Sequence, residues 1–210
     1  VVEGPGSDPG LSGFVDWKYR WLIEALQESE RPALRAALLR REHLAVAMNT
    51  AGQQHDPAAK TDLLALESQL AAADERLREL LHPATFAEYV LLKDADAELY
   101  RLEEYSDGIS NVAPLSPAQQ RAVLFAKLMY KQQYQQLLAD SGLETSDLPP
   151  SQRRYAYESV ARELEAYRNN FLLQAQQALD GADQYVLLQN YENTEFAEDL
   201  AKLRLAALGE

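Results

Sequence analysis

The sequence predicts an all-α protein, made of long amphipathic helices in a bundle or a stack of helical hairpins. Hydrophobic residues make up 47% of the 210 positions, which is too large a share for a disordered chain. Only nine Gly and nine Pro are present, too few for the many turns of an all-β fold. Apolar residues also recur at spacings of three and four, which indicates helices.

The chain is expected to begin with a tail and to continue as one domain. Residues 1–10 are rich in Gly, Pro and Ser, as in a flexible tail or linker. Such a segment would follow a removed signal peptide or a membrane anchor, and an expression-derived boundary would look the same. Residues 11–210 are predicted to form a single all-α domain, with possible halves at 11–108 and 115–208.

The first helix is expected over Leu11–Glu28, where apolar residues keep helical spacing. Its two tryptophans, Trp17 and Trp21, offer large apolar areas and are expected to anchor it in the core. Pro32 suits the first turn of the second helix, which should run to about Asn49.

The third helix is expected over residues 58–81. Gly52 is predicted to end the helix before it, with Asp56 as N-cap and Pro57 as the first helical residue. Leucines at near-heptad spacing and alanines that allow close approach predict packing in a hairpin or bundle.

A short stretch of sequence occurs twice, since Tyr89–Leu92 returns as Tyr185–Leu188. Around each copy we expect a short helix, a polar joint and a second helix, with the joints at Lys93–Asp96 and Gln189–Glu192. These two similar short-helix units suggest an internal repeat, although similar packing of two amphipathic helices could also produce the match. Six side chains of the first unit are expected to face inward: Phe86, Tyr89, Val90, Leu99, Tyr100 and Leu102. Asp107–Gly108 should close this unit with a turn.

Two long helices have recognisable starts. Ser116 can cap a helix that runs to about Asp140, and Gln119 stands where a capping box requires it. Gly142 is expected to end this helix. Leu148–Gln152 echoes the same start and predicts a second long helix that reaches about Leu179.

Composition excludes several classes of function. The chain has 33 acidic and 20 basic residues, with a net charge of −13 and no basic cluster, whereas nucleic-acid binding needs clustered cations. No apolar run approaches the roughly 20 residues that span a bilayer, so no direct membrane insertion is expected. The absence of Cys excludes disulfides and thiolate catalysis.

The sequence contains none of the common catalytic, nucleotide-binding or zinc motifs, so no catalytic residue, cofactor or metal site is predicted. Acidic residues in the two joints could bind Ca²⁺, but no EF-hand loop accompanies them. A solvated acidic face is the simpler interpretation.

The eleven tyrosines are the compositional excess that suggests a function. Tyrosine suits recognition surfaces because its ring is apolar and its hydroxyl polar. Core packing with the hydroxyl at the rim is the simpler interpretation for most of these rings. The candidate binding surface comprises Tyr100, Tyr105, Tyr130, Tyr134 and Tyr157.

Parts of the chain resemble known groups of proteins. The stretch LRELLHPATFAEYVLLKDADAELYRL, the helix start LPPSQRR and a second Leu-turn-Tyr unit near Leu179 resemble a pattern in uncharacterised exported bacterial all-helical proteins. The starts LSPAQ and LPPSQ are also similar to the LTxxQ signature of the Spy and CpxP group of periplasmic stress proteins, although Ser and Pro replace its Thr. The resemblance implies an exported location and an all-α architecture.

Two hypotheses about function follow. The first is a non-enzymatic extracytoplasmic protein that binds another protein as a scaffold, chaperone-like or accessory factor. Its location would be periplasmic or otherwise extracytoplasmic, and the sequence leaves a cytoplasmic location open. The second is a small-ligand-binding or catalytic bundle with a pocket lined by Tyr130, Tyr134, Tyr157 and a carboxylate.

Overall fold

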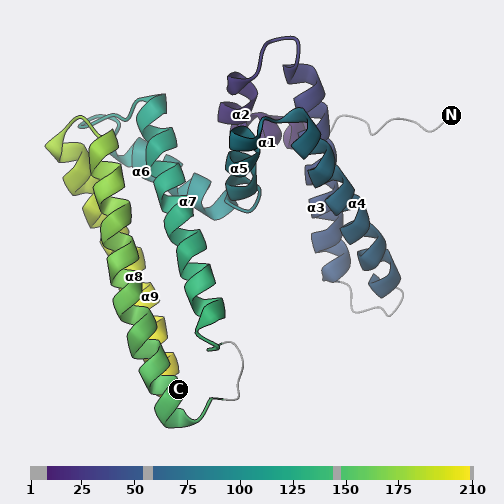
Figure 1. Ribbon diagram of the computed structural model, residues 1–210. Coiled ribbons are helices and arrows are strands. Elements are labelled where there is room, and N and C mark those ends of the chain that lie inside the picture. The colour runs from purple at the N-terminus through teal and green to yellow at the C-terminus, as the bar shows by residue number, and fades with distance from the viewer. Residues whose placement is uncertain (1–8, 54–58, 144–147, 209–210) are drawn as a thin grey trace. The chain divides into compact units, whose positions relative to one another are not determined.

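The structure is a computed structural model that describes residues 9–53, 59–143 and 148–208. Within these ranges every regular element is an α-helix, nine helices in all, which confirms the all-α prediction (Figure 1). Most of the expected tail and the expected start at Asp56 and Pro57 lie outside the described residues. No helix of the described ranges has a stretch long and apolar enough to cross a bilayer.

The chain divides into two compact units, Val1–Asp94 and Ala95–Glu210. The division falls between the two short helices of the first sequence repeat, whereas the possible halves were expected to part after residue 108. The two short helices therefore belong to different units.

The first unit is built on a helical hairpin. It contains α1 (Pro9–Lys18), α2 (Arg20–Ala25), α3 (Arg31–Gly52), α4 (Ala59–Leu80) and α5 (Pro83–Leu92). Helices α3 and α4 pack side by side, α1 lies on α3, and α5 contacts α2 and α4 (Figure 1). Leu34, Leu38 and Leu77 are completely buried and form the centre of this core.

The helix expected over Leu11–Glu28 is two helices, because the backbone leaves the helical conformation at Tyr19 (φ −107°, ψ 18°). Tyr19 is completely buried, and its hydroxyl donates a 2.5 Å hydrogen bond to Glu42 Oε1 of α3. The apolar spacing continues across this break, so periodicity alone does not reveal it. Trp21 is buried as expected, while Trp17 is half-buried against Phe14.

The polar joint at Lys93–Asp96 does end a helix, and tertiary contacts explain why. The carbonyl oxygen of Lys93 accepts hydrogen bonds from Lys18 Nζ at 2.8 Å and from Arg41 at 3.3 Å. These two cations take the place of the amide that would bond this oxygen in a continuing helix.

The second unit contains three long helices and one shorter one. They are α6 (Asp96–Ile109), α7 (Pro117–Asp140), α8 (Pro150–Ala178) and α9 (Ala182–Leu208). Helix α8 packs against α7 and α9, and α6 packs against α7 and α9 (Figure 1). The core between the long helices includes Val123, Leu124, Val160, Leu164, Phe171 and Leu188.

The second joint, expected at Gln189–Glu192, does not exist. Helix α9 is continuous from Ala182 to Leu208. This span contains no Gly or Pro, and its polar residues are all compatible with a helix interior. Helix α6 also continues past the expected turn at Asp107–Gly108, and Ile109 is buried at its end.

The two copies of the repeated stretch present the same side to their own cores. Leu92 and Leu188 are buried, whereas Val90 and Val186 are 39% and 50% exposed. The prediction that Val90 and Tyr100 face inward is therefore wrong, since Tyr100 is 58% exposed. The copies share an orientation but not the break that follows it.

The start of α7 confirms the predicted capping box. Gln119 N donates to Ser116 Oγ at 3.3 Å, and Ser116 N donates to Gln119 Oε1 at 2.9 Å. Gly142 follows the helix with φ 67°, a left-handed conformation that favours glycine. At α8 the echo is one of spacing only, because Pro149 occupies the N-cap position without a side-chain acceptor.

Replacing Ser116 by alanine should destabilise the protein by about 1 kcal/mol, because one amide of the first turn of α7 loses its acceptor. Urea unfolding followed by circular dichroism measures the change. Ser151→Ala is the matched control, since Ser151 lies in the first turn of α8, which has no side-chain cap. Equal losses in the two variants would contradict a stabilising cap at Ser116.

Candidate functional site

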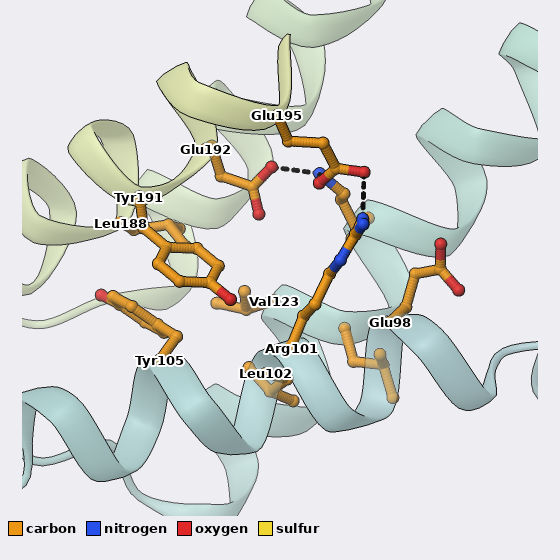
Figure 2. A pocket seen from close by; sticks show the side chains of 11 residues that line it. Glu98, Arg101, Leu102, Tyr105, Val123, Leu188, Tyr191, Glu192 and Glu195 are labelled. Atoms are coloured by element: carbon orange, nitrogen blue, oxygen red, sulfur yellow. Dashed lines mark hydrogen bonds and ion pairs between the residues drawn. The ribbon is translucent and has the colours of Figure 1, made fainter. Parts of the chain in front are cut away.

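Helices α6, α7 and α9 of the second unit enclose a gap with about 340 Å³ of empty space, part of it open to solvent (Figure 2). Its inner part is narrow, with room for about one water molecule. One side is apolar and the other is charged. The lining residues are Glu98, Arg101, Leu102, Tyr105, Val123, Leu124, Lys127, Leu188, Tyr191, Glu192 and Glu195.

Lys127 is the centre of the charged side. It is buried on α7, its Nζ pairs with Glu192, and it lies 2.8 Å from Glu195 Oε2. Glu195 also pairs with Arg101 and Lys131, so three cations from α6 and α7 meet one carboxylate of α9. Figure 2 shows Arg101 reaching across the gap to Glu195. The network connects three helices.

The two glutamates of this network differ in their acidity. Burial raises the pKa of Glu192, and the nearby ammonium group of Lys127 does not fully offset it. Burial would also raise the pKa of Glu195, but Lys127 and Lys131 outweigh it and lower that pKa to about 2. Glu195 is therefore the carboxylate whose ionised form the fold stabilises.

Two tyrosines form the opposite side of the gap. The rings of Tyr105 and Tyr191 lie 5.4 Å apart between centroids. Tyr105 donates to the carbonyl of Gln184 at 2.8 Å, and Tyr191 donates to Glu104 at 3.1 Å. Burial raises the pKa of each hydroxyl to about 12. Both hydroxyls are protonated at neutral pH and already have acceptors, so their role here is packing.

A second, smaller hollow of about 190 Å³ lies between α7, α8 and α9. Tyr130 packs against Phe171 there, with ring centroids 5.9 Å apart. Lys127 Nζ lies 5.4 Å and 5.3 Å from these two ring centroids, a distance at which a cation is attracted to an aromatic face. The same ammonium group thus holds the aromatic core and the carboxylates of α9 together.

A groove lies between the beginning of α8 and the end of α9, with about 1010 Å³ of empty space that includes open solvent. Tyr155 lines it and is 69% exposed, whereas Leu203 on the α9 side is buried. The groove therefore combines an accessible apolar surface with charged groups. Its lining residues are Tyr155, Tyr157, Glu158, Ala161, Arg162, Leu203 and Arg204.

The charges of the groove are not balanced internally. Glu158 pairs with Arg154 at 3.1 Å. Arg162 Nε donates to the backbone carbonyl of Glu158 at 3.3 Å and to no carboxylate among the described residues. Arg204 makes no hydrogen bond or ion pair with any described residue. Two guanidinium groups in the groove thus lack a carboxylate partner within the described chain.

The five tyrosines predicted from the sequence do not form one surface. Tyr105 lies in the gap and Tyr130 in the smaller hollow, while Tyr157 lines the groove. Tyr134 is half-buried and Tyr100 is exposed on α6. Of the three tyrosines expected in one pocket, Tyr130 and Tyr157 line different hollows, and Tyr134 lies near both of them.

Sequence reasoning missed the ion-pair network and the groove. Lys127 and Lys131 are one turn apart on α7, and Glu192, Glu195 and Asp199 follow one another on one face of α9. This complementarity is visible in the sequence only when α9 is taken as continuous. No pattern of charged residues in the sequence indicates the groove, because its residues lie on two helices that meet only in the folded chain.

The first unit contains a buried polar cluster of its own. Lys18 Nζ lies 3.5 Å from Glu42 Oε1, and Arg41 donates to the same oxygen at 2.8 Å. Tyr89 of α5 donates to Asp74 of α4. Each of these side chains has a partner, so the cluster holds α1, α3, α4 and α5 together.

No group of three or more His, Asp or Glu side chains in the described ranges is arranged to hold a metal ion. The Ca²⁺ site considered for the acidic joints therefore has no ligand set in this part of the chain. No protein-family model matches the chain, and no significant match was found among curated proteins or solved structures.

The acid sensitivity of the network can be measured at Glu195. The pKa of this carboxyl is about 2 in the folded protein and near 4.5 in the unfolded chain. Its contribution to stability is therefore complete above about pH 4.5 and is lost as the pH falls toward 2. Glu195→Gln should lower the free energy of unfolding by about 3 kcal/mol at pH 7 and by progressively less at pH 4 and pH 3.

Urea unfolding at each pH gives the comparison. Glu198→Gln serves as the control, because Glu198 is exposed on the same helix. A loss at Glu195 that stays constant between pH 7 and pH 3 would contradict the lowered pKa.

Proposed function

We propose that the chain is a non-enzymatic protein-binding module that acts outside the cytoplasm as a scaffold, chaperone-like or accessory factor. Its partner lies in the groove between α8 and α9. The observation that carries this proposal is the groove itself, an open hollow with an exposed tyrosine, apolar neighbours and two arginines. The extracytoplasmic location rests on the resemblance of the helix starts to those of exported helical proteins.

The composition of the groove suits protein recognition. Tyrosine and arginine are among the residues that most often dominate binding energy at protein interfaces. Tyr155 offers a largely exposed ring, the half-buried Tyr157 adds to it, and Leu203 closes the floor of the groove from α9. A groove between two long helices can accept the apolar face of a third helix or an extended segment.

The shape of the hollows also favours binding over catalysis. The charged gap beside Lys127 is narrow, and its lysine, its two paired glutamates and its two tyrosine hydroxyls all have partners. General acid–base catalysis needs a group that can exchange a proton near neutral pH and reach a substrate. The gap instead provides rigid support for the helix that carries one wall of the groove.

Site-specific cross-linking tests the proposal. A photoreactive benzophenone amino acid replaces Tyr155, and the protein is irradiated with a cell-envelope fraction of the source organism. We expect covalent adducts that excess unlabelled protein prevents. A scaffold or accessory factor should give a few discrete adducts, whereas a chaperone-like protein should give many.

The matched control places the same amino acid at Glu165, which is exposed on α8 but does not line the groove. Adducts that form equally at both positions, or at neither, would contradict partner binding in the groove.

A further inference from the structure

We infer that the groove selects an acidic amphipathic segment of its partner, whose carboxylates pair with Arg162 and Arg204 while its apolar side chains contact Tyr155 and Tyr157. This inference rests on the proposed function and adds the chemistry of the partner. It follows from the charges, the dimensions and the lining of the groove.

The two arginines differ from Arg154 and Lys202, which precede them on α8 and α9. Arg154 on α8 pairs with Glu158 at 3.1 Å, and Lys202 on α9 pairs with Asp199 at 3.8 Å. The protein as a whole carries a net charge of −13, so carboxylates are abundant. Arg162 and Arg204 nevertheless reach no carboxylate among the described residues, and they stand on the two opposite walls of the groove.

Guanidinium groups recognise carboxylates through paired hydrogen bonds. Arg162 uses only its Nε in the bond to the carbonyl of Glu158, which leaves its terminal nitrogens available to a ligand. Such charge-assisted bonds are stronger than those between neutral groups and fix orientation. With one arginine on each helix of the groove, two such bonds would hold an anionic segment along it.

The length of the groove along α8 restricts the ligand further. Tyr155, Glu158 and Arg162 lie on successive turns of α8, a length of about 10 Å. A segment of about two helical turns fills that length, with apolar residues on one face and carboxylates beside them. A nucleic acid does not fit, because two arginines within a strongly acidic protein cannot neutralise a run of phosphates.

Three synthetic peptides test the inference. Each is a fluorescein-labelled amphipathic helix of about four turns with one leucine stripe. The flanking positions carry Glu in the first, Gln in the second and Lys in the third. Fluorescence anisotropy at low salt measures the dissociation constants. We expect the Glu peptide to bind at least about tenfold more tightly than the Gln peptide, and the Lys peptide to bind most weakly.

Charge reversal locates the effect. Arg162→Glu and Arg204→Glu should each remove the preference for the Glu peptide. Lys202→Glu changes the net charge by the same amount on α9, but Lys202 does not line the groove, so the preference should remain. Circular dichroism and thermal melting check that all three exposed substitutions leave the fold intact.

The remaining outcomes would overturn the inference. Equal binding of the three peptides, lost in Tyr155→Ala, would leave the proposed function standing and remove the charge selection. If both Arg162→Glu and Arg204→Glu retain the preference for the Glu peptide, the acidic side chains bind at a site other than these two arginines. Absence of peptide binding would also overturn it, and the cross-linking at position 155 would then show whether the groove binds a partner of other chemistry. Self-association broken by Arg204→Glu would assign the groove to a second copy of the chain.

Discussion

A buried lysine in each unit constrains how the helices of that unit pack. Lys18 in the first unit is 1% exposed and Lys127 in the second is 7% exposed. Removing an ammonium group from water costs several kcal/mol unless a carboxylate accompanies it. Glu42 and Glu192 supply those carboxylates from other helices, so each pair fixes the rotation of one helix against another. A tyrosine ring beside each lysine completes the same arrangement.

In the second unit this constraint positions the groove. Glu192 and Glu195 bind the middle of α9 to the cations of α7, while Leu203 and Arg204 near the end of the same helix form one wall of the groove. Because α9 is continuous, fixing its middle also fixes its end. The ion pairs thus hold in place the helix that forms one wall of the proposed binding surface.

The candidate site could be predicted only in its residue types. Tyrosines and carboxylates stood out in the sequence, and Tyr105, Tyr130 and Tyr157 do line hollows of the second unit. Whether they form one surface could not be predicted, because that depends on which face of each helix is buried and on which helices pack against it. Arg162 and Arg204 gave no signal, since scattered arginines on helices are ordinary. What distinguishes these two is that both line one groove from different helices while neither pairs with a carboxylate among the described residues.

The sequence by itself determined the all-α class and those helix ends that a few neighbouring residues encode, such as the capping box at Ser116 and the glycine at Gly142. Tertiary structure decided the break at Tyr19, where a buried hydroxyl bonds to another helix, and the joint after Lys93, where two distant cations take up a carbonyl. It also decided that α9 is unbroken. Local signals act through hydrogen bonds within one turn, whereas burial and exposure depend on helices that meet only in the folded chain.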